Sequence, residues 1–378
     1  MHLVDITMFY AAEGGGVSTY LNAKARWLAQ HSQARHTIFS SNHVRHAGDS
    51  ALVLLPAVTV PGLHGYRFPL SVGLPARMMA RAMPDLIEAG DAGPGAWSAL
   101  RVKRRLGIPA VAFYHSDLQR LVQARFGQLA MRGTRRYLAQ LYRQFDLVMA
   151  PSRLMVQRLG AMGVAGAVHQ PLGIDTNTFA PRHRIAALRA HLGLPAGARL
   201  LVYAGRFTPE KKLHLLIDAV RRLGQPYHLL LIGGGLALPA SPQTRMIPFV
   251  RDQQALARLL ASCDLLVHPG DCETFGLIVL EAMACGLPVV GTTGGAVAEL
   301  VDEGTGILVA PNCARRLAEG IDALFARDLA AVSQAACSRA RELYDWNRIM
   351  PQLMARYAAL LATRGQSEPE AERVCVPE

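Results

Sequence analysis

Short apolar segments alternate with longer segments of helical periodicity along most of the chain. In the first half, strands are expected at 3–7, 36–40, 51–55, 85–88, 110–114 and 147–150. A helix is expected at 18–31, where Leu21, Ala25 and Leu28 recur at helical spacing. Such alternation is typical of a parallel sheet covered by helices on both faces, and it predicts the α/β class.

The same alternation begins again after a segment rich in Gly and Pro, 161–181, in which we interpret 166–181 as a linker. Strands are then expected at 199–203, 228–232, 244–250, 265–267 and 304–309. Helices are expected at 185–192, 213–223, 253–262, 277–284, between 310 and 340, and at 347–361. The pattern predicts two domains, 1–165 and 182–344, followed by a helical segment at 345–362 and a disordered tail at 363–378.

The segment 264–301 carries the clearest candidate chemistry. A helix is expected to open near Thr274, with Glu273 just before it and Glu281 within it. The free N–H groups of a helix start bind anions, and Gly276 lets a phosphate approach the backbone. The rise of a helix places the two acids at most about 12 Å apart, a length that suits a diphosphate between two sugars. Alternatively, Glu273 or Thr274 caps the helix and Glu281 is a solvated acid.

Two cations follow the strand expected at 199–203. Arg206 and Lys211 lie in the expected loop 204–212, where both side chains can be aimed at one diphosphate. The alternative is that they are exposed charges at a helix start. Cations at that end oppose the helix dipole, which favours another reason for their presence.

The first half of the chain has two weaker signals. Gly14, Gly15 and Gly16 join the first strand to a helix, as in a loop that approaches a phosphate or a sugar, but they do not form the GxGxxG pattern of dinucleotide-binding folds. His115 directly follows the strand at 110–114, and ligands of parallel sheets bind beyond the carboxyl ends of strands. Most single histidines are structural, so both interpretations of His115 stay open.

Charge is unevenly distributed along the chain, which has a net charge of +12. Residues 1–180 hold 19 Lys/Arg and 9 Asp/Glu, whereas residues 181–378 hold 21 and 19. A basic half suits nucleic acid, an anionic membrane or an acidic substrate, but no nucleic-acid-binding motif accompanies it, so no nucleic acid is expected. The arginine-rich helical segment 117–145 either lies on an anionic membrane surface or packs its apolar stripe against its own core.

Several classes of protein are disfavoured. The composition, 51% hydrophobic and 18% charged, predicts a globular protein. No window is apolar enough to span a membrane and the first residues do not resemble a signal peptide, so a cytoplasmic location is expected, with peripheral contact at the inner face of the membrane as an addition. The six cysteines occur singly, which suits reduced, buried thiols, and the absence of an Asp-x-Asp motif predicts that no metal is required.

In combination these motifs resemble the family 4 glycosyltransferases. The matching segments are GGGV at 14–17, YHSD at 114–117, PLGID at 171–175, AGRFTPEKK at 204–212, ETFGLIVLE at 273–281 with the following AMACGLPVV, and YDWNRIMPQLMARYAALL at 344–361. The resemblance implies the GT-B architecture, with two Rossmann-like domains facing across a cleft and the last helix crossing back onto the first domain. It also implies retaining, metal-independent transfer of a hexose from a nucleotide diphosphate sugar, with no other cofactor.

The resemblance also implies the roles of matching positions. Arg206 and Lys211 would hold the diphosphate, Glu281 the ribose hydroxyls and Glu273 the hydroxyls of the transferred sugar, with His115 beside that sugar. Further donor contacts are implied at Gly15, Gly16, Thr274, Phe275, Gly276 and Leu277, and around the base at Phe249, Val250 and Arg251. The segment before these last three residues departs from the family pattern, because it is short and has no charge before Arg245.

The YHSD segment and the basic first half look most like the lipid-mannosyl and related glycolipid transferases. This likeness implies a lipid-linked or glycan acceptor and GDP-mannose as donor ahead of UDP-glucose or another UDP-sugar. The alternatives are a non-catalytic subunit that binds a nucleotide sugar or glycan, and a GT-B sugar-nucleotide epimerase or phosphorylase. A dinucleotide oxidoreductase is disfavoured by the glycine spacing.

Overall fold

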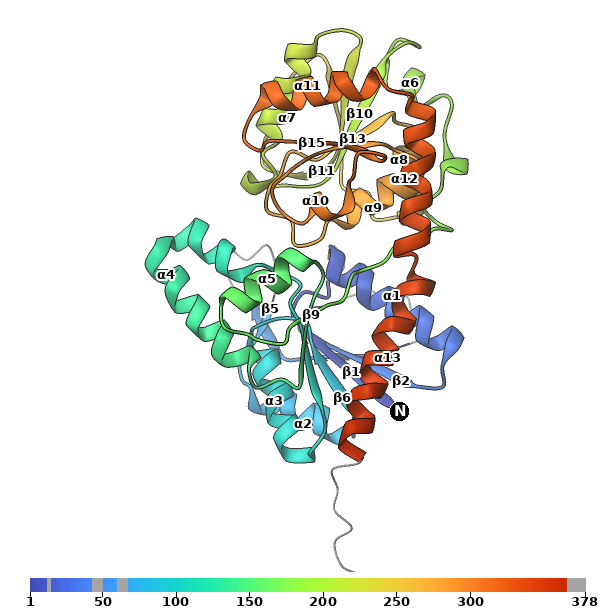
Figure 1. Ribbon diagram of the computed structural model, residues 1–378. Coiled ribbons are helices and arrows are strands. Elements are labelled where there is room, and N and C mark those ends of the chain that lie inside the picture. Colours follow the sequence, from blue (N-terminus) through green and yellow to red (C-terminus); the bar gives the residue numbers. More distant parts are fainter. Residues whose placement is uncertain (12–14, 43–49, 60–66, 366–378) are drawn as a thin grey trace, which may run out of the picture. The chain divides into compact units, whose positions relative to one another are not determined.

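The computed structural model describes residues 1–11, 15–42, 50–59 and 67–365 (Figure 1). The chain divides into two compact units. Unit 1 comprises Met1–Ala150, Val156–Gln170 and the C-terminal segment from Ile349, and unit 2 comprises Pro151–Met155 and Pro171–Arg348. The chain therefore passes from unit 1 to unit 2 after Gln170, within the segment expected to be the linker, and returns within its last helix.

Unit 1 is built on a parallel sheet with the strand order β3-β2-β1-β6-β7-β8-β9 among the described residues. The strands are β1 (His2–Thr7), β2 (Arg35–Ser40), β3 (Ala51–Leu54), β6 (Leu86–Ala89), β7 (Ala110–Phe113), β8 (Leu147–Ala150) and β9 (Val168–His169), and a small antiparallel pair is formed by β4 (Ala57–Thr59) and β5 (Arg67–Pro69). The helices are α1 (Gly16–His31), α2 (Gly73–Arg81), α3 (Pro94–Leu106), α4 (Leu118–Tyr142), α5 (Arg153–Ala161) and most of α13 (Trp346–Gly365). The central strands are buried throughout and mainly apolar, as expected of parallel strands covered on both faces.

Unit 2 has a second parallel sheet, with the order β12-β11-β10-β13-β14-β15 among the described residues. The strands are β10 (Arg199–Phe207), β11 (Tyr227–Gly235), β12 (Thr244–Ile247), β13 (Leu265–Val267), β14 (Val289–Thr292) and β15 (Gly306–Val309). The helical segments are η1 (Pro181–His183), α6 (Leu188–His191), η2 (Pro209–Lys211), α7 (Leu213–Leu223), α8 (Gln253–Ala261), α9 (Leu277–Ala284), α10 (Val297–Leu300), α11 (Ala314–Phe325) and α12 (Leu329–Tyr344). Two strand-and-helix halves of this kind confirm the predicted α/β class.

Strand β10 is longer than predicted, because it continues through Arg206 to Phe207 instead of ending at Tyr203. Its partner β11 likewise continues to Gly235. The two extensions pair Gly205 with Gly233 at close range: a Cβ added at Gly233 would lie 1.9 Å from the Gly205 carbonyl oxygen. The prediction of a loop at Arg206 was therefore wrong, since glycine here permits a close strand pair.

Three other boundaries differ from the expectation. The helix predicted at 185–192 is reduced to α6, and β12 ends at Ile247, so 248–250 lie beyond the strand. Helix α13 continues to Gly365, three residues into the predicted tail, and the rest of that tail, 366–378, lies outside the described residues.

Helix α4 packs on its own core, one of the two alternatives considered for 117–145, over only part of its length. Its backbone breaks at Gly127, which has a φ of 79°. After the break, Leu138 and Leu141 are fully buried in unit 1, as expected of a helix that packs on its own core. Close to the break, Phe126 and Leu129 are 66% and 80% exposed. The apolar stripe is therefore covered by unit 1 only in the second part of the helix.

The cysteines are less uniformly buried than predicted. Cys263 and Cys285 are buried, whereas Cys272, Cys313 and Cys337 are half-buried, and all five are free thiols. Cys375 lies outside the described residues. Within the described ranges there is no cluster of three or more His, Cys, Asp or Glu side chains suited to a metal ion. No helix in the described part of the chain has the length and hydropathy needed to cross a membrane.

Candidate functional site

The carboxyl ends of β10 and β13 bring Lys211 and Glu273 together in unit 2. Lys211 ends the short turn η2 after β10, and Glu273 lies in the loop between β13 and α9. The Lys211 ammonium forms an ion pair with Glu273 Oε1, and the two side chains are 20% and 18% exposed. Because β10 and β13 are neighbouring parallel strands, their loops emerge at the same edge of the sheet, where ligands of such sheets bind.

His268 is a third member of this cluster and was not predicted from the sequence. It directly follows β13, and its Nε2 lies 2.9 Å from Glu273 Oε1. A carboxylate only accepts hydrogen bonds, so Nε2 carries the hydrogen in this contact. Its Nδ1 is buried and has no hydrogen-bond partner among the described residues. The available signal was its position: a histidine at the end of an apolar strand, five residues before an acid.

The electrostatics of the cluster keep Glu273 ionised. Burial alone would raise the pKa of its carboxyl group, but the Lys211 ammonium and the His268 hydrogen bond lower that pKa well below the usual range. An ionised, partly exposed carboxylate is a strong acceptor for the hydroxyl groups of a ligand.

Arg206 lies near this cluster but is not paired with it. Its side chain is exposed and forms no hydrogen bond or ion pair with the described residues. Its carbonyl oxygen accepts a hydrogen bond of 3.1 Å from the Tyr203 hydroxyl, and the pKa of Tyr203 is raised by burial and by the nearby Glu273. Both Arg206 and Glu273 therefore lie close enough to Tyr203 to shift the pKa of its hydroxyl group.

The helix after this loop begins later than predicted, which excludes one of the alternatives. Helix α9 begins at Leu277, and its N-cap is Gly276 with a φ of 103°, a left-handed conformation that favours glycine. Glu273 and Thr274 therefore do not cap the helix. The segment Thr274–Gly276 instead joins the acid to a helix start whose N–H groups are available to an anion.

Glycines of the loop after β14 hold the Glu273 loop in place. A Cβ added at Gly295 would lie 3.0 Å from the Glu273 nitrogen, and the N–H of Ala296 donates to the Glu273 carbonyl oxygen over 2.9 Å. This backbone contact fixes where the acid stands before any ligand is bound.

Glu281 lies in the second turn of α9 and is almost fully buried, at 9% exposure. Burial raises the pKa of its carboxyl group to about 7. The carboxyl group has no hydrogen bond or ion pair with any of the described residues. Glu281 is thus a largely buried acid without a partner among the described residues, and its oxygens are not among the fully enclosed unpaired atoms, so they remain accessible to a ligand. The alternative of an ordinary solvated acid is therefore wrong.

The three residues expected around a base lie after β12. Phe249 is 46% exposed, and Val250 and Arg251 precede α8, whose N-cap is Asp252. Their link to Glu273 and Glu281 stays a prediction.

The predicted residues of unit 1 form a separate group. Gly15 is the N-cap of α1 and Gly16 its first residue, both are exposed, and a Cβ at Gly15 would meet no atom of the described residues within 4 Å. Gly14 lies outside the described residues. The open space around Gly15 is compatible with the approach of a ligand to the backbone.

His115 follows β7 and is 8% exposed. Its ring stacks on Phe113 at 4.1 Å between centroids and lies 5.3 Å from the Tyr20 ring. Burial lowers the pKa of His115 to about 3, so the imidazole is neutral at pH 7. His115 therefore acts at neutral pH as a hydrogen-bonding group and not as a cation.

A buried charge cluster beside His115 was also missed in the sequence. Lys24 of α1 is 2.9 Å from Asp5 of β1 and 3.5 Å from Glu88 of β6, and its ammonium donates to the Tyr357 hydroxyl of α13 over 3.0 Å. Figure 1 shows α13 running along the part of unit 1 that contains β1 and β2. Three of these residues are 1 to 3% exposed as side chains, so the cluster is part of the core.

Comparisons with known proteins agree with this fold. Residues 185–341 match the family described as "Glycosyl transferases group 1", and residues 14–178 match "Glycosyltransferase Family 4". The chain belongs to the family 4 glycosyltransferases and is a hexosyltransferase, as the sequence predicted.

Two relatives from Mycobacterium tuberculosis illustrate the sequence similarity. The chain is 29% identical to a GDP-mannose-dependent alpha-(1-6)-phosphatidylinositol dimannoside mannosyltransferase, over 95% of this chain and 97% of that protein. It is 31% identical to a GDP-mannose-dependent alpha-mannosyltransferase, over 71% of this chain and 77% of that protein.

Solved structures show the fold. Sucrose-phosphate synthase from Thermosynechococcus elongatus matches with a TM-score of 0.79 and 22% identity, over 96% of this chain and all of that chain. Anabaena HepE in complex with UDP and glucose matches with a TM-score of 0.76 and 21% identity, over 94% and 99%. The GT-B fold is thereby confirmed.

Proposed function

We propose that the chain is a retaining mannosyltransferase that moves a hexose from GDP-mannose to a lipid-linked acceptor. The observation that carries the proposal is the buried, unpartnered Glu281 on the helix that directly follows the Glu273 loop. The names of the mycobacterial relatives support the donor and the lipid nature of the acceptor. UDP-sugars are the second choice, because HepE was solved with UDP and glucose.

In this proposal each of the four charged residues of the candidate site in unit 2 binds one part of the donor. Glu281 accepts hydrogen bonds from the ribose hydroxyls, which satisfies its buried carboxyl group. Glu273 accepts from hydroxyls of the transferred sugar, with His268 holding its orientation. Lys211 and the exposed Arg206 bind the diphosphate, and the N–H groups from Phe275 to Leu277 assist them.

Cleavage of the bond between sugar and phosphate places negative charge on the departing diphosphate. Lys211 and Arg206 are fixed cations that stabilise this charge more strongly as it develops, which lowers the barrier. The departing phosphate is proposed to take the proton of the acceptor hydroxyl on the same face of the sugar, which retains the anomeric configuration. Because two side chains supply the positive charge, we propose that no metal is needed.

Unit 1 is proposed to contribute Gly15 and Gly16 near phosphate and a neutral His115 as a hydrogen-bonding group near the sugar. We also propose peripheral contact with an anionic membrane, which a lipid-linked acceptor would require. The exposed Phe126 and Leu129 support this contact, as does the absence of any Asp or Glu between Leu118 and Tyr142.

The decisive experiment compares Lys211→Gln with Lys212→Gln. Lys212 is a matched control, because it is the next residue of the same loop and pairs with a different acid, Asp271. Loss of the Lys211 cation is expected to reduce kcat about a hundredfold, whereas the control retains most activity. Transfer of radiolabelled mannose to membrane extract is the assay. Equal activity of both variants would show that Lys211 does not stabilise the leaving group.

The donor base is tested by the shift in melting temperature with GDP, UDP and ADP. A ligand that binds the folded state raises the melting temperature according to its affinity and concentration. The proposal expects the largest shift with GDP. A strong shift with no turnover of any donor would instead identify a non-catalytic nucleotide-sugar-binding protein.

A further inference from the structure

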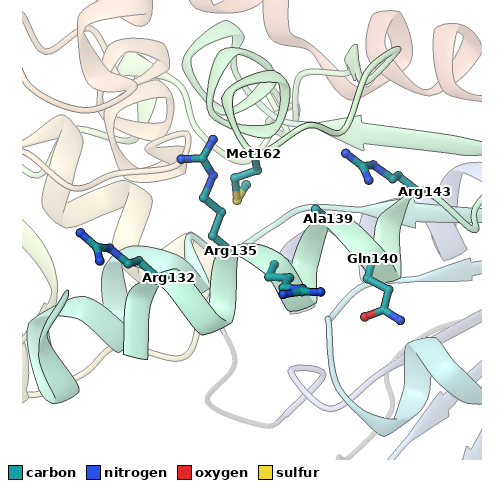
Figure 2. Close-up of a pocket in the computed structure, with 7 residues that line it drawn as sticks. Arg132, Arg135, Ala139, Gln140, Arg143 and Met162 are labelled. Atoms are coloured by element: carbon teal, nitrogen blue, oxygen red, sulfur yellow. The ribbon is translucent and has the colours of Figure 1, made fainter. Parts of the chain in front are cut away.

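A pocket of about 550 Å³ lies in unit 1 between the second part of α4 and the end of α5 (Figure 2). Its walls include four arginines, and its apolar part is formed by the nearly buried Ala139 and Met162. Figure 2 shows Arg135 extending from the helix beside Met162. The arginines are Arg132, Arg135, Arg136 and Arg143.

The positive charge of this pocket is not neutralised by the protein. None of the four arginines forms an ion pair with any residue in the described ranges, and α4 itself contains no Asp or Glu. By contrast, Lys103 near the end of α3 is neutralised, because it forms an ion pair with Asp146 at 2.9 Å. Four neighbouring guanidinium groups repel one another, so an anion between them lowers the free energy of the folded chain.

Two of the guanidinium groups are held in place. Arg135 donates to the carbonyl oxygen of Ala161, the last residue of α5, and Arg143 Nε donates to the carbonyl oxygen of Gly163 over 2.8 Å. These oxygens orient the two side chains but supply no net charge to cancel theirs. The remaining N–H groups stay available, so the pocket is organised before a ligand arrives.

The lining selects among anions. A guanidinium presents paired N–H donors that match phosphate oxygens, and several guanidinium groups together suit an anion with more than one charged oxygen. Among the described residues no aromatic side chain lines the pocket, so they offer no platform for the base stacking used by single-stranded nucleic acid. The chemistry therefore points to a phosphate group without an attached base.

We propose that the arginine pocket, formed by Arg132, Arg135, Arg136 and Arg143, is a binding site for one phosphate group, separate from the donor site of unit 2. The phosphate is carried by an anionic lipid headgroup or is a free ion, and both share the chemistry that the pocket recognises. The proposal goes beyond the transferase activity and does not depend on the identity of the donor.

The test removes two charges in the pocket and compares them with two charges elsewhere in unit 1. Arg132→Gln with Arg136→Gln is the pocket variant, chosen because Arg135 and Arg143 also bind backbone oxygens that a variant would leave unpaired. Arg101→Gln with Arg105→Gln on α3 is the matched control, since both side chains are exposed and the loss of net charge is equal. Melting temperatures of both variants verify folding.

Binding is measured in two arms with the full chain. One arm titrates inorganic phosphate by calorimetry. The other measures co-sedimentation with vesicles of phosphatidylcholine, alone or mixed with phosphatidylglycerol. In the arm that contains the phosphate source recognised by the pocket, the pocket variant is expected to bind about thirtyfold more weakly than the unmodified chain. The control variant is expected to bind about as tightly as the unmodified chain.

The two arms also identify the source of the phosphate. A pocket-dependent response to inorganic phosphate alone identifies a free ion, and one seen only with phosphatidylglycerol identifies a lipid headgroup; either result supports the proposal. Equal losses in the pocket variant and the control would show diffuse attraction to net charge and overturn it. Unchanged binding by the pocket variant in both arms would overturn it as well.

Discussion

Glu88 of unit 1 and Glu281 of unit 2 are both buried, and burial raises the pKa of each carboxyl group to about 7. Their surroundings differ completely. Glu88 accepts hydrogen bonds from the hydroxyls of Tyr20 and Tyr357 and lies 3.5 Å from the Lys24 ammonium. Glu281 has no such partner in the described part of the chain.

The difference separates an acid whose hydrogen bonds are satisfied within the protein from an acid that we propose binds a ligand. A buried polar group whose hydrogen bonds are satisfied helps to specify the fold, whereas one without partners destabilises it and is retained for another reason. A raised pKa alone therefore does not mark a functional site in this protein. The partners of the group, or their absence, decide between the two roles.

The largest effect is expected from Lys24→Met, which removes the cation that pairs with Glu88. The substitution leaves Asp5 and Glu88 buried without their cation, and removing one partner of a buried ion pair destabilises a protein by about 3–5 kcal/mol. Chemical denaturation measures the loss. A variant as stable as the original chain would mean that the cluster is not what holds these elements together.

A second test exchanges each glutamate for the neutral, similarly shaped glutamine. Glu281→Gln should weaken donor nucleotide binding by about 2 kcal/mol, the usual contribution of hydrogen bonds to a charged group. Glu88→Gln should leave nucleotide affinity unchanged. Calorimetric titration with GDP compares the two variants. Equal affinity losses in both would end the distinction between them.

The pH dependence of the stability of Glu281→Gln tests the burial of the Glu281 carboxyl group directly. A carboxyl group whose pKa is raised on folding stabilises the folded state at low pH, and that stabilisation is lost as the pH rises from about 4.5 through about 7. Glutamine does not titrate. The stability of the variant relative to the original chain should therefore increase by about 3 kcal/mol over this range. Denaturation at a series of pH values measures the change, and a flat difference would contradict it.

The smallest effect is expected at His268, which we regard as a positioning residue for Glu273. His268→Leu removes the donor to the Glu273 carboxylate, so the pKa of Glu273 should rise and kcat should fall about tenfold. His268→Gln supplies a comparable N–H and should restore part of the rate. The pH–rate profile distinguishes positioning from packing, because only loss of the hydrogen bond moves its acidic limb.

Local patterns predicted the fold well and identified the segment that carries the candidate site of unit 2. The apolar periodicity identified nearly all strands of both sheets, and the residues of the 273–281 segment proved to flank a helix start as expected. Arg206 was predicted to lie in a loop because glycine is common in loops. Here Gly205 and Gly233 instead allow two strands to pair closely. Local sequence could not distinguish these two uses of glycine.

Other features depend on contacts between distant segments. The cluster around Lys24 joins residues that are up to 333 positions apart, and no periodicity reveals such a meeting. The lack of a partner for Glu281 could not be predicted from the sequence either, because it depends on the side chains of all the elements that pack around it. His268 became significant only when β13 and its loop placed it beside Glu273.

The hydrogen bond between Lys24 and Tyr357 has a consequence for biosynthesis. A ribosome delivers α1 early, but the segment of α13 that completes the surroundings of Lys24 emerges only after the whole of unit 2 has been made. The N-terminal unit is therefore the last to be finished. A nascent chain that stops anywhere before Tyr357 leaves the Lys24 ammonium and the Glu88 carboxylate without the hydroxyl that contacts both of them, so unit 1 is completed only after unit 2 has been made.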